Sequence, residues 1–352
     1  MPDWTRSMSQ TFEYYLVNPN TWGDDVQIRD VTSCSIDRDS TADTLGSASI
    51  DFTEDHGEEY IREYLVTRQN GITERFPLGT HLIQSPKTTF DGRVGGASID
   101  GYTPLIELKE NPPPIGYTVS KGANIMNTAY ALCGENMRAP VIPAKSSEVL
   151  YDDFVANTSD TWLSFIQSLV AQARFCITVD ENGVVMFAPI QDTKSLQPVM
   201  TFDDGNSSIL YPSVTYERDF YSIPNVVEVL YSSDSKKYYA RVENNDKNSP
   251  TSIVNRGRMI TYRDTNPNIS GLPNQQMVQE YAEQLLRNQS ALEYKITYSH
   301  AYCGNRIGDC IRLNYERAGL VNIKARVISQ SFNCTAGCKV TETATYTVNT
   351  WK

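Results

Sequence analysis

The stretch NRIGDCIRLNY, residues 305–315, decides the fold of the last part of the chain. Gly308 is able to adopt the positive φ angle of a tight turn, and the Asp309 carboxylate is placed to accept hydrogen bonds from nearby backbone N–H groups. After this turn, every second residue from Ile311 to Tyr315 is apolar or aromatic, which is the period of a strand with one buried face. The stretch therefore predicts a strand that is entered through a Gly-Asp turn.

Two further segments extend this strand into a small sheet. In VNIKARVISQSF, residues 321–332, Ile323, Ala325 and Val327 alternate with polar side chains. CKVTETATYTV, residues 338–348, shows a similar alternation and is rich in threonine. β-Branched residues in a period of two favour strands. We therefore expect a meander of strands that forms a small β-barrel.

Four cysteines lie at the ends of these strands: Cys303, Cys310, Cys334 and Cys338. Free thiols are the simplest interpretation, because cysteine packs as a small hydrophobe. Four converging thiolates would instead bind Zn²⁺ or an iron–sulfur cluster, although neither spacing is the C-x2-C of a zinc knuckle. A disulfide across the hairpin loop between Cys334 and Cys338 is a third interpretation. The sequence leaves these three open.

The composition of the whole chain limits its class. A length of 352 residues predicts about two to four domains, since a single core stops growing at this size. The 21 tyrosines favour β-structure. A net charge of −11 argues against specific binding of nucleic acid, whose phosphates the surface would repel. The sequence has no signal-peptide pattern and no apolar run of about 20 residues, so we expect cytoplasmic synthesis without membrane insertion.

The first hundred residues alternate in the manner of strands. The clearest alternations are in residues 25–39 and 45–55. Residues 56–71 are ambiguous between a short helix and a strand pair. Asp91 and Gly92 lie between two strand-like runs and predict a hairpin turn.

Three consecutive prolines in ENPPPIGY, residues 110–117, predict a domain boundary. A short helix is expected from about Gly122 to Asn136. A stronger one lies in SDTWLSFIQSLVAQARF, residues 159–175, and we expect Ser159 or Asp160 to cap it. Its apolar positions follow helical spacing and form one stripe: Trp162, Phe165, Ile166, Leu169, Val170 and Ala173.

The helix at 159–175 leads directly into a predicted hairpin, residues 175–189, that turns at Asn182 and Gly183. From Phe202 onwards strands return, with a strand pair at about 224–244. A single late helix in QQMVQEYAEQLLRN, residues 275–288, is expected to bury a stripe between positions 277 and 286.

No motif in the sequence assembles an active site. The three histidines are His56, His81 and His300, and none belongs to a zinc-protease motif. Nucleophile elbows and phosphate-binding loops are absent from the sequence. The carboxylates of the segments DEN (180–182) and FDDG (202–205) lie in turns, where they commonly cap backbone groups. We therefore assign no catalytic, cofactor-binding or metal-binding residue and expect no enzyme activity.

The chain resembles the baseplate or tail-tip hub proteins of tailed phages and phage-tail-like particles, of the late-control gene D type and its defective-prophage relatives. The resemblance covers nearly the whole chain in element order and is most specific in the second half. It lies in these segments: FPLGTHLIQSPKTTFDG (76–92), DTWLSFIQSLVAQARFCITVDENGVVMF (160–187), IPNVVEVLY (223–231), YYARVENNDKNSPTSIVNRGRMITY (238–262), QQMVQEYAEQLLRN (275–288) and RIGDCIRLNYERAGLVNIKARVISQSF (306–332).

The resemblance implies an α+β, mainly β fold with four parts. A first tube-like β-barrel is expected at 1–105 and a small α/β domain at 106–205. A second tube-like β-barrel would combine 206–233 with 293–352, around an inserted segment at 234–292 that holds one helix. Hubs of this kind are homotrimers whose six barrels form a pseudo-sixfold ring.

The same resemblance implies the partners. The ring would contact the hexameric tail tube protein on one side and the threefold spike or tail-tip protein on the other. Other baseplate proteins would surround it, and a tape measure protein would lie in its lumen. The protein would be assembled in the host cytoplasm and reside in the virion. Its acidic balance suits a lumen through which DNA passes without sticking.

Two alternatives to a hub remain. A carbohydrate-binding tail-tip protein would use the many tyrosines as sugar platforms, and exposed tyrosines clustered at one loop end would favour it. A metal-containing or iron–sulfur tail-tip protein, or a thiol enzyme, would use Cys303, Cys310, Cys334 and Cys338. Some relatives carry a lytic domain after the hub, but we expect none here because the sequence ends at TVNTWK, residues 347–352.

Overall fold

The computed structural model describes residues 2–54, 56–90, 92, 95–218, 220–221, 223–232, 236–265, 267 and 274–349. The chain divides into two compact units, which are described separately. The first unit comprises Met1–Val214 and Tyr298–Thr343, and the second comprises Thr215–Thr297 and Ala344–Lys352. Strands account for 47% of the chain and helices for 16%, which confirms the predicted mainly β, α+β class.

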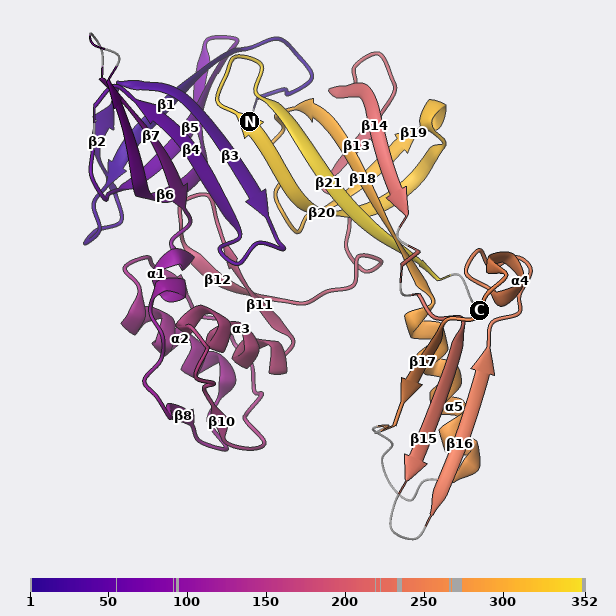
Figure 1. Ribbon diagram of the computed structural model, residues 1–352. Helices are drawn as coiled ribbons and strands as arrows, with labels where there is room; N and C mark the ends of the chain where they lie inside the picture. Colours follow the sequence, from indigo (N-terminus) through magenta and orange to yellow (C-terminus); the bar gives the residue numbers. More distant parts are fainter. Residues whose placement is uncertain are drawn as a thin grey trace. The chain divides into compact units, whose positions relative to one another are not determined.

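Seven antiparallel strands form the first part of the first unit, which we call the N-terminal β-domain (Figure 1). They lie in the order β3-β4-β7-β6-β5-β1-β2, so that β2 is the last strand of this path. Their bounds are β1 Ser9–Val17, β2 Asp24–Ile28, β3 Val31–Asp39, β4 Gly46–Phe52, β5 Tyr60–Gln69, β6 Ile72–Phe90 and β7 Gly95–Tyr102.

The alternation predicted for this region is confirmed in β4, where Ala48, Ile50 and Phe52 are buried in the core. Within the ambiguous residues 56–71, Tyr60–Gln69 form strand β5 and no helix, and β5 pairs with β6 through the turn at Asn70 and Gly71. Both turn residues have positive φ angles, as two-residue hairpins require. The predicted hairpin between β6 and β7 is also present, although its turn residue Asp91 lies outside the described residues.

A small α/β domain follows within the first unit. It contains α1 (Leu105–Glu110), β8 (Thr118–Val119), α2 (Ile125–Asn136), β9 (Val141–Ile142), β10 (Phe154–Val155), α3 (Trp162–Gln172), β11 (Phe175–Val179) and β12 (Val185–Pro189). The predicted stripe of α3 is confirmed as the centre of its core. The predicted cap is wrong: Thr161 caps α3, since its side chain accepts a hydrogen bond from the Ser164 N–H. The short helix α1, which precedes the prolines, was not predicted.

Six further strands form what we call the C-terminal β-domain: β13 (Met200–Asp203), β14 (Leu210–Arg218), β18 (Ala291–Ala301), β19 (Cys310–Tyr315), β20 (Leu320–Asn333) and β21 (Lys339–Asn349). Three of them, β14, β18 and β21, continue beyond the first unit. The Gly-Asp turn is confirmed, because Gly308 has a φ of 88° and Asp309 Oδ2 accepts a hydrogen bond of 2.8 Å from the Arg306 N–H. Strand β20 also pairs with β3, so the two β-domains share one 13-stranded sheet.

The second unit contains a three-stranded sheet in the order β16-β15-β17, together with two helices. The elements are β15 (Val226–Ser232), β16 (Lys237–Glu243), α4 (Ile253–Arg256), β17 (Thr261–Asp264) and α5 (Gln275–Gln289). Val278, Ala282 and Leu286 of α5 pack on one face of the sheet, which confirms the predicted late helix and its stripe. Within the described residues of both units, no helix is long and apolar enough to cross a bilayer.

Candidate functional site

The tip of the β11–β12 hairpin connects the α/β domain to the N-terminal β-domain. Asn182 presents its carbonyl oxygen to two donors: Trp22 Nε1 at 2.8 Å and Arg62 Nη2 at 2.9 Å. The Thr80 hydroxyl donates to the Glu181 carbonyl at 3.1 Å. Gly183 has a φ of 73°, which the tight Asn-Gly turn requires. The predicted turn at 182–183 is thus a docking element between two domains.

Arg62 is the buried centre of this contact, with 5% of its surface exposed. Its Nη1 lies 2.9 Å from Asp24 Oδ1, and its Nε donates to Thr80 Oγ1 at 2.9 Å. Together with the bond to Asn182 O, these contacts engage the whole guanidinium fork. A buried arginine is tolerated when its charge is paired and its donors are used, as they are here.

Glu181 joins three parts of the first unit. Its carboxylate lies 3.5 Å from Arg38 Nη1 of β3 and 3.0 Å from Arg306 Nη2, which precedes β19. Arg38 is largely buried and also donates to Gln330 Oε1 of β20 at 2.8 Å. The α/β domain is therefore linked electrostatically to both β-domains through one carboxylate.

The two β-domains also meet directly. Strands β3 and β20 pair in antiparallel register, with Phe332 opposite Ile36. Trp4, near the N-terminus, packs against Phe76 of the N-terminal β-domain and Tyr302 of the C-terminal β-domain, with ring centroids 5.2 and 5.4 Å apart. These contacts bury apolar surface across the joint, which favours a single rigid body over two independent domains.

A buried polar cluster lies inside the C-terminal β-domain around Glu342, whose side chain is fully buried. Tyr298 donates its hydroxyl to Glu342 Oε2 at 2.5 Å, and Asn305 Nδ2 and Gln330 Nε2 donate to Oε1 at 2.6 and 2.5 Å. His300 Nε2 lies 3.1 Å from Oε1, although the N–H is poorly aligned for a hydrogen bond. The carboxylate is thus surrounded by donors, as a buried charge requires.

His300 and Glu342 stabilise each other's charges. Burial alone would lower the pKa of His300, but the close polar contacts with Cys303 and Glu342 and the Glu342 charge outweigh it and raise this pKa to about 10. Burial likewise opposes ionisation of Glu342, yet His300, Tyr298 and Gln330 hold its pKa below the ordinary value. The pair is therefore ionised over the neutral range.

Cys303, His300 and Glu342 together resemble the residue types of a thiol-protease triad, but the geometry does not support that chemistry. His300 Nδ1 donates to the Ala301 carbonyl at 2.7 Å, so it is not free to accept the Cys303 proton. The Cys303 thiol, 3.8 Å away, donates to Asn305 Oδ1. All three side chains are buried. The arrangement is a structural polar cluster.

The four C-terminal cysteines are free thiols in different surroundings. Cys303 belongs to the polar cluster, and Cys310 begins β19 with its thiol directed to the Ile311 carbonyl. Cys334 and Cys338 lie in the core at the joint of the two β-domains. Among the described residues, no group of three or more His, Cys, Asp or Glu side chains is arranged to hold a metal ion.

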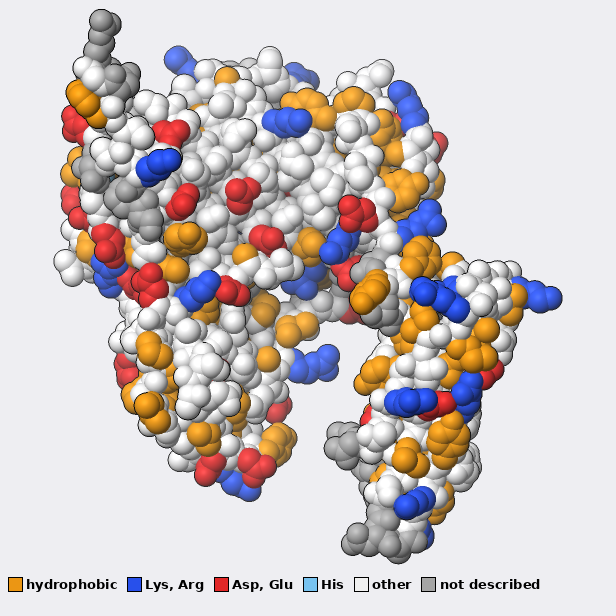
Figure 2. All heavy atoms as spheres, viewed as in Figure 1, with side chains coloured by type: hydrophobic (Ala, Val, Ile, Leu, Met, Phe, Trp, Pro, Cys, Tyr) orange, Lys and Arg blue, Asp and Glu red, His pale blue; other side chains and the backbone are white. Residues whose placement is uncertain are grey.

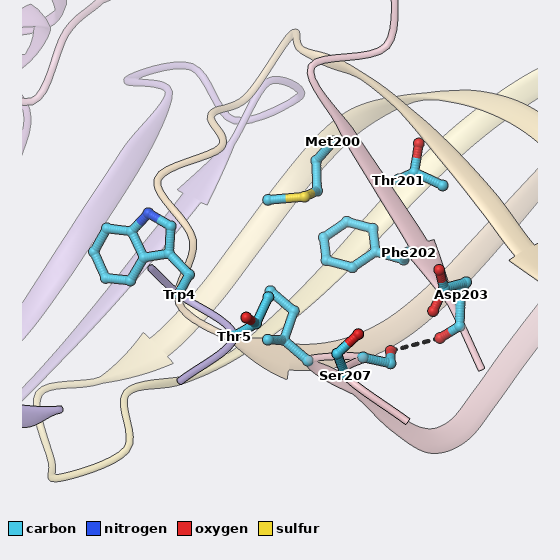
Figure 3. Close-up of a pocket in the computed structure, with 9 residues that line it drawn as sticks. Trp4, Thr5, Met200, Thr201, Phe202, Asp203 and Ser207 are labelled. Atoms are coloured by element: carbon cyan, nitrogen blue, oxygen red, sulfur yellow. Dashed lines mark hydrogen bonds between the residues drawn. The ribbon is translucent and has the colours of Figure 1, made fainter. Parts of the chain in front are cut away.

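One small cavity of about 160 Å³ lies between Trp4–Thr5 and residues 200–209 (Figure 3). Met200, Phe202 and Trp4 line it, together with Asp203 and backbone of the following turn. Substrate sites usually enclose about 300–1,000 Å³ and carry convergent polar groups. This cavity is a packing gap beside the N-terminal segment and offers no substrate site.

The second unit has one sheet face that α5 does not cover. Leu230, Tyr239 and Met259 are 39%, 50% and 57% exposed. Figure 2 shows hydrophobic side chains next to Lys and Arg on this unit. Across the strands, Glu228 bonds Arg241 and Arg263 at 2.7 Å each. An exposed face that mixes large apolar groups with paired charges is typical of a protein contact surface.

Sequence reasoning predicted the turn at Asn182 and the capping role of Asp309, but it missed Arg38, Arg62 and Glu181. Arg62 meets Asn182 across 120 positions in the sequence. No local signal marks Arg38 or Arg62, since each has a partner in another domain of the chain. The residue types at 180–183 predict a turn, but they do not predict that the turn contacts the N-terminal β-domain.

No protein-family model matches the sequence, and no curated protein sequence matches it. The solved structure of a tail protein from Neisseria meningitidis MC58 matches with a TM-score of 0.67 and 12% identity, over 97% of this chain and 98% of that chain. The 43 kDa tail protein of prophage MuSo2 from Shewanella oneidensis matches with a TM-score of 0.63 and 11% identity, over 95% and 97% of the two chains.

A third solved structure is the E. coli c3393 protein, a component of the type VI secretion system with structural similarity to the T4 bacteriophage tail proteins gp27 and gp5. It matches with a TM-score of 0.50 and 10% identity, over 90% of this chain and 73% of that chain. At such low identity the agreement lies in the fold. Since it extends over nearly the whole length, this chain has the fold of phage and prophage tail proteins.

Proposed function

We propose that the chain is a non-enzymatic structural hub of a phage tail or phage-tail-like particle. The observation that carries this proposal is the joining of two β-domains into one sheet through β3 and β20, with β2 and β14 left at the two ends of the strand path. Open strand edges are a liability unless a specified partner covers them. A ring of identical subunits supplies such a partner at every edge.

In the proposed assembly, three copies form a ring of six tube-like barrels. Each copy contributes residues 1–105 as one barrel and 206–233 with 293–352 as the other, while 106–205 and 234–292 form the two remaining domains. A trimer of two-barrel subunits matches a hexameric tail tube on one side and a threefold spike or tail-tip protein on the other. The fold likeness to tail proteins supports this symmetry argument.

The two β-domains differ in charge: residues 1–105 contain 17 acidic and eight basic side chains, whereas residues 298–352 contain three acidic and seven basic ones. Residues 215–297 contain ten acidic and ten basic side chains, so the net charge of −11 arises entirely outside that segment. A negatively charged wall repels DNA and lets it slide. We propose that the ring surrounds the channel, that a tape measure protein fills it before ejection, and that other baseplate proteins contact residues 106–205 and 234–292. The protein then resides in the virion.

The exposed tyrosines favour a hub over a carbohydrate-binding protein. They lie on separate elements: Tyr130 on α2, Tyr151 before β10, Tyr211 and Tyr216 on β14, Tyr221 after it, Tyr239 on β16 and Tyr262 on β17. A sugar platform would gather such rings at one loop end. The metal or thiol-enzyme alternative is not favoured either, because the Cys303 cluster is buried and His300 Nδ1, the nitrogen near the thiol, donates to the Ala301 carbonyl.

Imaging of the purified particle, with the chain tagged on its α/β domain, tests this proposal. We expect three copies in a ring at the end of the tail tube. A Val26→Lys substitution adds a charge to the edge strand β2 at a side chain that is 55% exposed, and we expect it to prevent incorporation. Ile115→Lys, at a 95% exposed position of the α/β domain, is the matched control.

Both variants are expected to keep the thermal stability of the isolated wild-type protein, since both sites are exposed. Label at any other place in the particle, a copy number other than a multiple of three, or normal incorporation of Val26→Lys would refute the ring proposal.

A further inference from the structure

Two cysteines face each other at the joint of the two β-domains. Strand β3 pairs with β20 in a register that ends with Ser35 opposite Asn333. The next pair in this register is Cys34 and Cys334, and the Cys334 N–H donates to the Cys34 carbonyl at 2.9 Å. Directly opposed residues of this hydrogen-bonded kind have Cα atoms about 5.5 Å apart. Disulfides span Cα separations of about 4.4–6.8 Å, so the spacing typical of such a pair lies within the range that a disulfide bridges.

The side chains of the pair also meet. Cys34 is 5% exposed and lies in the core of the N-terminal β-domain, where Cys334 packs against the same cluster. The two thiols interact with each other and with the Tyr14 hydroxyl. The interaction with Cys334 and burial raise the pKa of Cys34 well above its ordinary value. Cys34 is therefore a poor first nucleophile, whereas Cys334 is half-buried at a hairpin tip and accessible.

Cys338 is the other thiol near Cys334, and it is less suited to pair with it. Cys338 is fully buried, and its backbone closes the 335–338 turn by donating to the Thr335 carbonyl at 2.9 Å. Its carbonyl also accepts from the Tyr302 N–H. Because Cys34 lies opposite Cys334 on the paired strand, it is the better disulfide partner for Cys334. Cys338, the partner that the hairpin spacing suggested, is less suited.

We propose that Cys34 and Cys334 form a thiol modification site, which a low-molecular-weight disulfide oxidises to an intramolecular disulfide that links the two β-domains covalently. The thiolate of Cys334 attacks one sulfur of the small disulfide, forms a mixed disulfide and releases one small thiol. The thiolate of Cys34 then attacks Sγ of Cys334 and releases the second small thiol. The two protein thiols lose two protons and two electrons, and the small disulfide takes up both electrons as it is reduced to two thiols.

The bond would join residues 300 positions apart in the sequence, so it would constrain the unfolded chain strongly. In the reducing interior of a cell the thiols stay free, and oxidation follows on release into an oxidising exterior. This change of surroundings rests on the proposed tail function, whereas the chemistry of the pair does not. The released particle would then carry a covalent bond across the joint between the two β-domains of each chain.

Incubation of the purified full-length protein with oxidised glutathione, followed by peptide mapping under non-reducing conditions, tests the proposal. We expect loss of two titratable thiols, a linked peptide pair containing Cys34 and Cys334, and a rise in Tm that dithiothreitol reverses. Cys334→Ala is expected to abolish both the linked pair and the rise in Tm. Cys338→Ala, the matched control at the neighbouring thiol, is expected to retain them.

Three results would overturn the proposal: a linkage of Cys334 to Cys338, glutathione that remains attached to Cys334 as the final product, or no loss of thiols. If Cys334→Ala does not fold, the peptide map of the wild-type protein decides alone. None of these readouts depends on ring formation, so failure of this proposal is distinguishable from failure of the proposed hub.

Discussion

His300 Nε2 lies 3.1 Å from Glu342 Oε1, and neither side chain is exposed to solvent. A second histidine–glutamate pair is buried in the N-terminal β-domain, where His81 Nδ1 lies 3.0 Å from Glu63 Oε1. Each of these histidine–glutamate pairs links two neighbouring strands, β18 and β21 in the C-terminal β-domain and β5 and β6 in the N-terminal β-domain. A buried ionised pair contributes little net stability when it is intact, but loss of one partner leaves an uncompensated charge.

The His300–Glu342 pair predicts a specific dependence of stability on pH. The folded-state pKa of His300, about 10, exceeds its ordinary value of 6.5. The stabilisation is therefore complete below about pH 6.5 and is lost as the pH rises towards 10. For Glu342, whose pKa is lowered, the stabilisation is present above the ordinary value of 4.5 and is lost as the pH falls. Urea unfolding between pH 6.5 and 9 is expected to show a declining free energy of unfolding.

Substitution of the histidine tests this assignment. His300→Gln is expected to cost about 3–5 kcal/mol at pH 6 and to remove the decline between pH 6.5 and 9. His56, which pairs with Asp30 at 2.9 Å in a partly exposed site, is the control. His56→Gln is expected to cost about 0–1 kcal/mol. An unchanged slope in His300→Gln would show that this histidine is not protonated in the folded state.

Local features of the fold were predictable because they depend on neighbouring residues. The stripe of α3 follows from helical spacing, and the turn at Gly308 and Asp309 follows from residue types with special backbone and capping properties. The α3 cap was misplaced because Ser159, Asp160 and Thr161 are all good cap residues, and the sequence alone does not distinguish them. The sequence left β5 ambiguous because the strand is stabilised by its pairing with β6, which exists only in the folded protein.

Contacts between domains were not predictable in the same way. The pairing of Ile36 with Phe332 joins positions almost 300 residues apart, and hydrophobic periodicity says only that each residue faces a core. The same limit applies to Cys34 and Cys334, because the hairpin spacing drew attention to Cys338 while strand register determined the actual neighbour. Periodicity gives the buried face of a strand, and tertiary pairing chooses its neighbour.

Glu181 is expected to hold the α/β domain against both β-domains. Glu181→Gln removes the charge that Arg38 and Arg306 share at 3.5 and 3.0 Å. We expect a loss of about 1–3 kcal/mol in the free energy of unfolding, because Arg38 is largely buried. Amide hydrogen exchange of the hairpin residues 180–184 is expected to become faster. Glu148→Gln, at an exposed position of the same domain, is the control and is expected to change neither quantity.

Removal of the helix cap at Thr161 tests the corrected start of α3. The Thr161 side chain accepts a hydrogen bond from the Ser164 N–H at 3.2 Å, and the Ser164 hydroxyl accepts one from the Thr161 N–H at 3.0 Å. Thr161→Ala is expected to cost about 1 kcal/mol in urea unfolding. Thr158→Ala, three residues earlier at an exposed position, is expected to stay within about 0.5 kcal/mol of the wild type. Equal costs would place the cap elsewhere.

Gly183 lies where the hairpin tip touches the N-terminal β-domain, and its substitution separates backbone strain from steric conflict. Its φ of 73° disfavours any side chain, and a Cβ atom there would lie 2.9 Å from Thr80 Cβ and 3.1 Å from Trp22 Cζ2. Gly116 has a similar φ of 79° but no heavy atom within 4 Å of a built Cβ. Gly116→Ala therefore reports strain alone, about 1–2 kcal/mol.

We expect Gly183→Ala to lower the free energy of unfolding by about 1–3 kcal/mol more than Gly116→Ala does, because the added methyl group forces the hairpin away from Thr80 and Trp22. Displacement of the tip also breaks the bonds from Trp22 and Arg62 to the Asn182 carbonyl, so amide exchange in residues 180–184 should accelerate in this variant and not in Gly116→Ala. Urea unfolding and hydrogen exchange measure the two effects separately. Equal stability losses with unchanged exchange would mean that the hairpin tip does not dock on the N-terminal β-domain in solution.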